Sequence, residues 1–297
     1  MIWSARAFKE EAARGPWRRA AGRFMHSRAA VIAAALLLLL ALAAVCVPPL
    51  LPHTYDDIFW EHIKGAPSVS AAGFHPFGFD VNGRDLFART LLGLRVSLQI
   101  ALLATAVSVA VGVAYGAIAG YFGGRLDEAM MRFVDILYAL PYILFVILLM
   151  VIFGRHEILL YLGIGLLEWV TMARIVRGQT LSLREREFVA AARVAGLRPA
   201  AIIFRHITPN LAGPVVIYAA LTIPEIILTE SFLSYLGFGV QEPRTSLGTL
   251  ISEGTDNLSV YPWILAFPGS VLFCVLLCMI LIGDGLRDAL DPRGRRR

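Results

Sequence analysis

The sequence predicts an all-α integral membrane protein with six transmembrane helices, and three observations support this fold class. The composition is 58% hydrophobic and 16% charged, whereas soluble domains carry about 25% charged residues. Most of the apolar runs reach the roughly 20 residues that a helix needs to cross about 30 Å of hydrocarbon. Lys and Arg gather in alternate connecting segments, as they do in multi-pass membrane proteins. The predicted spans are about 29–51, 97–121, 133–153, 158–175, 211–236 and 262–282.

The basic residues also predict the orientation of the chain. Segments 1–28, 122–132, 174–206 and 284–297 hold 21 of the 27 Lys and Arg residues. Because cytoplasmic loops carry the excess of basic residues, we expect both termini in the cytoplasm. The net charge of +5 then lies at the membrane surface, which argues against nucleic-acid binding. The basic tail, 293–297, is expected to contact lipid headgroups.

The N-terminal part divides into three predicted segments. Residues 1–28 form a cytoplasmic segment that is either an interfacial amphipathic helix or a flexible lead-in. Residues 29–51 form the first span, which we expect to be retained because its apolar core exceeds the 7–15 residues of a signal peptide. Residues 52–96 form an extracytoplasmic segment, with a short helix at about 85–93 leading into the second span.

The second span opens a permease-like core, residues 97–283, and carries a ridge of small residues. Gly112, Gly116 and Gly120 recur at intervals of four. Such ridges allow helix backbones to approach closely in lipid. We predict tight packing within the bundle, with dimerisation of two subunits as the alternative. A turn at 121–125 follows, and the next helix is expected to begin over 126–135.

The fifth span combines helix-bending and acidic residues. It contains Pro214 and Pro224, which bend helices, and Glu225 and Glu230, which are candidates for a solute pathway. The two acids are five residues apart, so they do not share one helix face. The segment 237–261 is an expected outside loop with a short helix at about 246–253.

No metal site or catalytic residue is expected. The three cysteines, Cys46, Cys274 and Cys278, lie in apolar runs without the spacing of a metal site. We expect them to pack as small apolar side chains.

A polar segment between the fourth and fifth spans, residues 184–209, predicts a pair of short surface helices. Residues 185–195 are rich in Ala, Arg and Glu, which are strong helix formers. Gly196 is placed to end this helix, and Pro199 fits the first turn of the second. A small apolar face would suit docking into a groove on another protein, although an interfacial helix without a partner has the same pattern. That face comprises Phe188, Ala191, Ala192 and Ala195.

The same segment resembles the cytoplasmic EAA loop of ABC importer permeases. Its pattern is Glu-Ala-Ala, three residues, Gly, and a later Ile-x-Leu-Pro; Ala191, Ala192, Gly196 and Pro209 match it. The sequence departs from the pattern at three positions, where Ala190, His206 and Thr208 replace Glu, Ile and Leu. Glu187, one turn earlier, could partly replace the missing acid.

Further ordered motifs extend the resemblance over most of the chain after residue 75. The block 75–86 is similar to the family's HPxGTDxxGRD entry, and 233–241 to its SFLGLGVQ block. Residues 120–124 and 132–135 resemble its second and third span junction, and 283–292 its C-terminal signature. The chain therefore resembles the C-type permease subunit of dipeptide, oligopeptide and nickel importers.

This resemblance implies a type I importer fold, a bacterial inner-membrane location and a set of partners. The partners are a homologous permease subunit, two cytoplasmic ATPases and an extracytoplasmic substrate-binding protein. The cargo stays open among peptides, nickel chelates and other small solutes. Glu187, Phe188, Arg193 and Gly196 are the residues expected to dock on the ATPase. The chain itself is expected to bind no cofactor, with ATP and Mg²⁺ used by partner subunits. Its only lysines, Lys9 and Lys64, lie outside any phosphate-binding loop.

Two other function classes compete with an ABC permease. An ion- or proton-coupled carrier would use the acids inside the spans, Glu168, Glu225 and Glu230. A membrane-embedded enzyme would use Asp284, but that residue has no partner acid in a facing span and more simply pairs with Arg287 on a helix surface. We therefore expect a transport subunit and not an enzyme.

Overall fold

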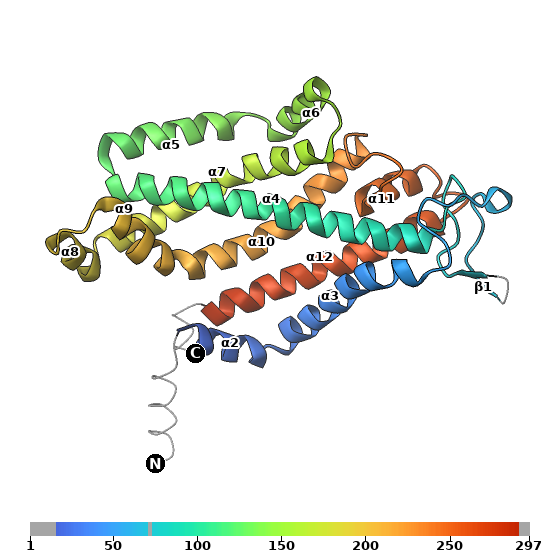
Figure 1. Ribbon diagram of the computed structural model, residues 1–297, viewed down its shortest axis with the longest axis horizontal. Coiled ribbons are helices and arrows are strands. Elements are labelled where there is room, and N and C mark those ends of the chain that lie inside the picture. The colour runs from blue at the N-terminus through green and yellow to red at the C-terminus, as the bar shows by residue number, and fades with distance from the viewer. Residues whose placement is uncertain (1–15, 71–72, 291–297) are drawn as a thin grey trace, which may run out of the picture.

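Long helices run side by side along the molecule, and a β-hairpin and a short helix cover one end of them (Figure 1). This computed structural model describes residues 16–70 and 73–290. The end that carries strands β1 and β2 and helix α11 is called the hairpin end, and the opposite end, with α8 and α9, the α8 end. The α-helices and strands are α2 (Pro16–His26), α3 (Arg28–Cys46), β1 (Ser68–Ser70), β2 (Gly73–His75), α4 (Leu86–Phe122), α5 (Gly124–Ala139), α6 (Tyr142–Phe153), α7 (Glu157–Arg184), α8 (Glu187–Val194), α9 (Pro199–Ile202), α10 (Thr208–Tyr235), α11 (Leu247–Thr255) and α12 (Trp263–Leu290). Three shorter helical turns are η1 (Pro48–Leu50), η2 (Trp60–His62) and the π-helical η3 (Ile203–Ile207).

The fold class is confirmed as all-α, and the described residues include five helices long and apolar enough to cross a membrane, or six if a bent pair counts as one span. The five are α3, α4, α7, the run Pro199–Tyr235 and α12. Antiparallel β-pairing is confined, among the described residues, to the small hairpin of β1 and β2 and two isolated bridges.

The third predicted span, 133–153, is wrong as a single straight helix. Helices α5 and α6 meet at Leu140–Pro141 and are bent by 79°. The residue before a proline is disfavoured in helical geometry, and Leu140 is extended, with ψ of 137°. Helix α6 alone has 12 residues, which cover about 18 Å at 1.5 Å per residue. This part of the chain therefore does not form a simple rod through the bilayer.

The second span starts earlier than its apolar run. The short helix expected at 85–93 is the first part of α4, which begins at Leu86. The Asp85 carboxylate caps it by accepting a hydrogen bond of 2.6 Å from the Ala88 backbone N–H. At its other end the helix stops before Gly123, whose φ of 66° favours glycine.

The centre of the bundle is the contact between α4 and α7. A Cβ atom placed on Gly112 would lie 2.6 Å from Cβ of Met172, and one on Gly120 would lie 2.7 Å from Cβ of Thr180. At Gly116 the neighbours include the Ala173 carbonyl oxygen and the Arg177 backbone nitrogen. All three glycines thus lie against α7 of the same chain, where only a hydrogen fits.

The cap at the hairpin end contains the other predicted short helix. Helix α11 is confirmed, with Ser246 as its N-cap and its side chain accepting from the Thr249 N–H at 3.1 Å. Its buried residues include Leu247 and Leu250, and the helix contacts α4, α10 and α12.

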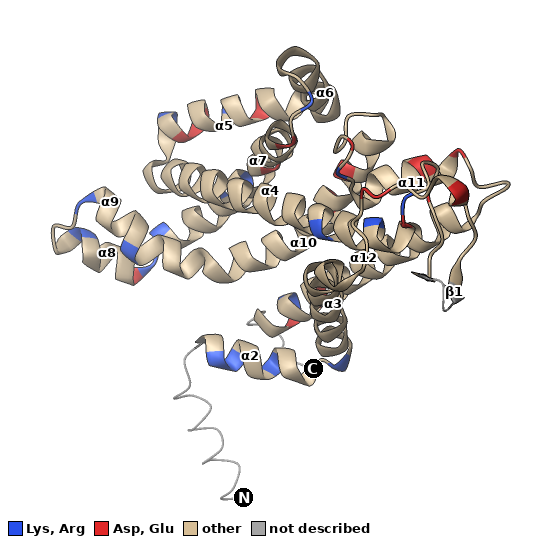
Figure 2. Cartoon of the chain, turned by 45° about the vertical axis from the view of Figure 1, so that its right-hand side comes forward, with Lys and Arg blue, Asp and Glu red and all other residues tan. Residues whose placement is uncertain are grey.

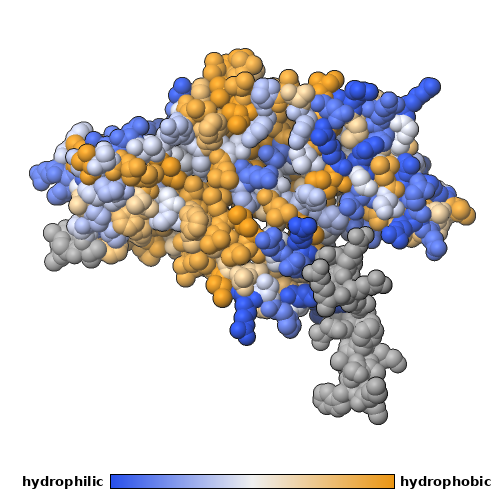
Figure 3. Space-filling view, turned by 180° about the vertical axis from the view of Figure 1, so that it is seen from behind, coloured by the Kyte–Doolittle hydropathy of each residue, from blue (hydrophilic) through white to orange (hydrophobic). Residues whose placement is uncertain are grey.

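Charged residues are separated along the length of the molecule. Figure 2 shows acidic residues near α11 and the loops of the hairpin end, and basic residues on α2 and around α8 and α9. Between the ends, the face seen in Figure 3 is largely apolar. Residues 16–26 of the N-terminal segment are helical, whereas residues 1–15 and the tail at 293–297 lie outside the described residues.

Candidate functional site

Helix α8 is a short, well-terminated helix at one end of the bundle. It runs from Glu187 to Val194, and Gly196 follows with φ of 76°. The Leu197 N–H bonds to the Ala192 carbonyl at 3.2 Å, and the Gly196 N–H to the Arg193 carbonyl at 3.0 Å. This pair of bonds is a Schellman motif, which needs a left-handed residue at the position of Gly196. The predicted stop is therefore confirmed.

Helix α8 packs on the bundle through a face different from the one predicted to dock on another protein. Val189 and Ala192 are buried and belong to a cluster with Ile202, Ile203 and Ile207. Phe188, Ala191 and Ala195 are exposed, so only Ala192 of the predicted face points into the protein. Most of the face predicted to dock on another protein is therefore exposed, and Val189, which lies outside that face, anchors the helix to the bundle.

The outward face of α8 carries apolar side chains that are exposed to solvent. Phe188 retains 39% of its surface and Val194 90%. Glu187 and Arg193 are also exposed, and the Arg193 guanidinium lies 5.3 Å from the centre of the Tyr121 ring at the end of α4. This cation–π contact links the surface helix to the bundle.

The second predicted short helix is not separate. It begins with Pro199 at its first turn, as expected, but helical structure continues through η3 into α10 as far as Tyr235. Pro209 lies in the first turn of α10, just after the π-helical residues. The fifth span and the short helix that follows α8 are therefore one continuous helical run of 37 residues.

A cavity of about 600 Å³ lies on the side of the bundle formed by α7, α10 and the bend between α5 and α6. Two carboxylates line it, Glu168 from α7 and Glu225 from α10. Neither forms an ion pair within residues 16–70 and 73–290. The remaining lining residues are aromatic, aliphatic or Thr: Leu137, Tyr138, Leu140, Tyr142, Leu167, Val170, Thr171, Leu228 and Thr229. Such a cavity can attract a cationic group on a solute.

Glu230 does not share that cavity. Its carboxylate is fully buried and accepts hydrogen bonds from Ser234 at 2.7 Å and Ser97 at 3.3 Å. Ser97 in turn accepts from the Leu247 N–H at 3.1 Å. This network joins α4, α10 and α11, and it separates Glu230 from Glu225.

Sequence reasoning missed a buried ion-pair network at the hairpin end. Arg89 of α4 pairs with Asp80, and both side chains have no exposed surface. Arg89 also lies 3.5 Å from Glu253 of α11. Burial raises the pKa of Glu253, and the nearby Arg89 partly opposes this shift. The signal in the sequence was an arginine inside an otherwise apolar helix.

Two further ion pairs attach α5 to α7. Arg177 forms a two-pronged contact with Asp127, with Nε–Oδ1 and Nη2–Oδ2 distances of 2.5 and 2.7 Å. Arg174 bonds to Asp135 at 2.8 Å and stacks over Tyr138. Paired charges of this kind hold the bent segment in place beside the cavity.

Two segments of the chain match known protein families. Residues 112–296 match the family described as binding-protein-dependent transport system inner membrane component. Residues 15–67 match the N-terminal TM domain of oligopeptide transport permease C.

Individual relatives match over nearly their whole length. The chain is 48% identical over 282 residues to the oligopeptide transport system permease protein OppC of Escherichia coli K12, covering 95% of this chain and 93% of the relative. It is 40% identical over 280 residues to the protein of that name from Bacillus subtilis, with 94% and 90% covered. Among solved structures, a chain of the inward-facing MetNI methionine ABC transporter aligns with a TM-score of 0.55 at 16% identity, covering 69% of this chain and 96% of that one. At this identity the likeness concerns the fold alone.

Proposed function

The chain belongs to the family of binding-protein-dependent transport system inner membrane components, and we propose that it forms half of the translocation pathway of an oligopeptide importer. It is a multi-pass membrane permease subunit and not an enzyme. ATP hydrolysis belongs to separate subunits. The observation that carries the proposal is the foot at the α8 end, an exposed short helix anchored to a 37-residue helix that passes the cavity.

The proposed orientation places both termini and α8 in the cytoplasm. The basic residues near α2 and α8 support it, as does the acidic character of the hairpin end (Figure 2). In this orientation α8 faces ATPases in the cytoplasm, and the hairpin end faces an extracytoplasmic substrate-binding protein.

In the proposed coupling step, α8 docks in a groove on an ATPase subunit. Phe188, Ala191 and Gly196 supply the contact surface, Glu187 pairs with a basic group on the ATPase, and Arg193 supports the helix from the side of Tyr121. The burial of Val189 and Ala192 fixes α8 against the run that becomes α10. ATP-driven closure of the ATPases would move the docked foot and α10 together, which shifts the pathway between two states.

The proposed solute pathway follows the face that Glu168 and Glu225 line. A second, homologous permease subunit would close the open side of this cavity. The ammonium group of a peptide is complementary to the two carboxylates, and the relatives are permease proteins of oligopeptide transport systems.

The coupling role of α8 can be tested in a reconstituted complex of this chain with its partner permease, ATPases and binding protein. Phe188→Ala is expected to lower peptide-stimulated ATP hydrolysis, because an aromatic anchor in an interface commonly contributes 2 kcal/mol or more, on the order of a 30-fold effect. The control is Phe204→Ala, which also removes an exposed ring at the α8 end but on η3.

Equal loss in both variants, or none in either, would refute a specific docking role for Phe188. Cross-linking gives an independent test. Ala191→Cys on α8 should cross-link to the ATPase, whereas Ser259→Cys, exposed near the hairpin end, should not. A reversal of this pattern would contradict the proposed orientation.

A further inference from the structure

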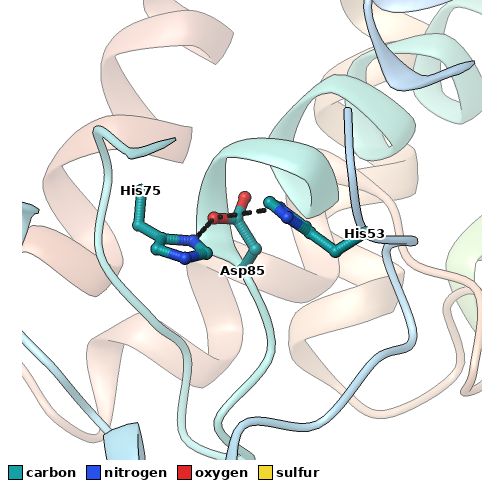
Figure 4. A group of neighbouring side chains, drawn as sticks. All are labelled: His53, His75 and Asp85. Carbon is teal, nitrogen blue, oxygen red and sulfur yellow. Dashed lines mark hydrogen bonds and ion pairs between the residues drawn. The ribbon is translucent and has the colours of Figure 1, made fainter. Parts of the chain in front are cut away.

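Three side chains converge at the hairpin end, away from both the foot and the cavity. His53 follows η1 after the first span, His75 ends β2, and Asp85 caps α4. Figure 4 shows both imidazole rings directed at the Asp85 carboxylate. One nitrogen from each histidine and one carboxylate oxygen all lie within 4.8 Å of one another.

The cluster is shielded from solvent. The side chains of His53, His75 and Asp85 retain 8%, 12% and 0% of their surface. The rings of Phe59 and Phe79 pack against the histidines, with Phe79 centred 4.5 Å from His75. Polar side chains in such surroundings need partners, since water cannot replace them.

One polar atom of the cluster, Nε2 of His53, has no hydrogen-bond partner among the described residues. His75 donates from Nδ1 to Asp85 Oδ2 at 2.5 Å, and Oδ1 of the same carboxylate accepts from the Ala88 N–H. His53 Nε2 lies 3.5 Å from Oδ2 and is buried without a hydrogen-bond partner among the described residues. A buried nitrogen aimed at an anionic oxygen that already accepts a bond is suited to a shared cation.

We propose that His53, His75 and Asp85 bind a divalent transition-metal cation, Zn²⁺ being the ion that best suits two imidazoles and one carboxylate. Zn²⁺ takes nitrogen and oxygen ligands at about 2.0–2.2 Å, so tetrahedral ligand atoms lie roughly 3.3–3.5 Å apart. The His53–Asp85 separation of 3.5 Å already fits. Mg²⁺ and Ca²⁺ prefer oxygen ligands and would bind more weakly.

Binding replaces the proton between His75 and Asp85. His75 would release its Nδ1 proton to solvent and ligate through Nδ1 as the neutral tautomer that keeps the proton on Nε2, and the Asp85 carboxylate would share the cation. The His75–Asp85 pair opens by about 0.9 Å to admit the cation, consistent with metal binding that displaces protons. The Ala88 N–H holds Asp85 in place from behind, an orienting contact common at metal sites.

One of the three proposed ligands, His53, borders a cavity. A cavity of about 220 Å³ lies beside His53 and is also lined by Leu92 and Arg95. With three protein ligands, water or another ligand would fill the fourth position. The cation would fasten the loop after α3 and the hairpin to the start of α4, at the end proposed to meet the binding protein.

Zinc binding can be measured on the purified full-length chain in lipid nanodiscs. We expect one Zn²⁺ per chain by elemental analysis after equilibration with a zinc buffer, and a rise in unfolding temperature with Zn²⁺ but not with Mg²⁺. Loss of an outer-shell contact alone lowers metal affinity by roughly 10–100-fold. His53→Gln removes a proposed ligand, so it should weaken zinc binding by more than that. His62→Gln is the matched control, because His62 stacks on Phe79 in the same region but lies outside the cluster.

The two histidines separate a metal site from a hydrogen-bonded one. His53→Gln should abolish the zinc-dependent rise in unfolding temperature and leave the metal-free value nearly unchanged. His75→Gln should lower both, since it also removes the bond to Asp85. A wild-type chain without stoichiometric zinc, or a His53→Gln chain that binds zinc as well as His62→Gln does, would overturn the proposal. Neither result depends on transport, so failure here leaves the proposed function intact.

Discussion

Arg89 and Asp80 form an ion pair in which neither side chain has any exposed surface. Asp80 also accepts hydrogen bonds of 2.8 Å from the backbone N–H groups of Asn82 and Arg84, which shape the turn before α4. The pair therefore joins the second span to the cap at the hairpin end. The position of α4 relative to that cap depends on this contact.

Removing one member of the pair should destabilise the chain strongly. Asp80→Ala leaves the Arg89 guanidinium buried with only the more distant Glu253, and breaking a buried pair in this way costs about 3–5 kcal/mol. Asp135→Ala breaks the more exposed pair with Arg174, where about 0–1 kcal/mol is expected. Unfolding in the same detergent compares them, and equal losses would show that burial of the Arg89–Asp80 pair is unimportant.

Glu253 gives a pH-dependent prediction. Burial raises its pKa above 4.5, so the folded state holds the proton at a pH where the unfolded state has lost it. Stability then decreases as pH rises from 4.5 through the folded pKa, because ionisation is unfavourable only in the folded state. Glu253→Gln should raise the unfolding temperature at neutral pH, with a gain that shrinks on acidification. A gain that is largest at acidic pH would contradict this sign.

Substitution by alanine should have opposite effects on stability at Gly116 of α4 and at Gly178 of α7. At Gly116 a methyl group would meet the backbone of α7, which cannot move aside, so Gly116→Ala should cost about 1–3 kcal/mol. Gly178 lies within α7 with no atom within 4 Å of an added Cβ. There, Gly178→Ala should stabilise by about 0.5–1 kcal/mol through helix propensity. Thermal unfolding of the two variants measures the difference, and destabilisation by both would argue against steric contact as the cause.

The acidic cavity predicts a dependence on cargo charge. Glu225→Gln should raise the transport KM for a peptide with a free amino terminus by roughly tenfold, because a bond to a charged group contributes about 1.5–3 kcal/mol. The N-acetylated form of that peptide should be affected much less. Glu128→Gln removes an exposed acid of α5 outside the cavity and serves as the control. An equal rise in KM for both peptides would show that Glu225 does not bind the ammonium group.

Hydrophobic run length and basic-residue distribution predicted the membrane class, and Gly196 and Pro199 predicted the boundaries of the surface foot. The bend at Leu140–Pro141 was missed because the length of an apolar run shows that a segment is hydrophobic but not where its helix axis changes direction. Continuity from Pro199 to Tyr235 was missed because the polar residues Arg205 and His206 interrupt the apolar run, so the predicted span began only at 211.

The contacts between distant segments had no sequence signal. His53 and Asp85 belong to segments separated by one helical turn and a hairpin, and only the fold brings them to 3.5 Å. Glu168 and Glu225 likewise share a cavity although they lie on different spans. Periodicity predicts which face of one helix is apolar, but not which faces meet.

The π-helical turn at Ile203–Ile207 sets the rotational phase of the fifth span. A π turn accommodates one residue more than an α turn, and each residue corresponds to about 100° around a helix axis. If that turn tightened to α-helical geometry while α8 stayed fixed, every side chain beyond it would swing by about that angle. Glu225 would then leave the cavity that it shares with Glu168. A five-residue irregularity near α8 thus decides which side chains of α10 line that cavity.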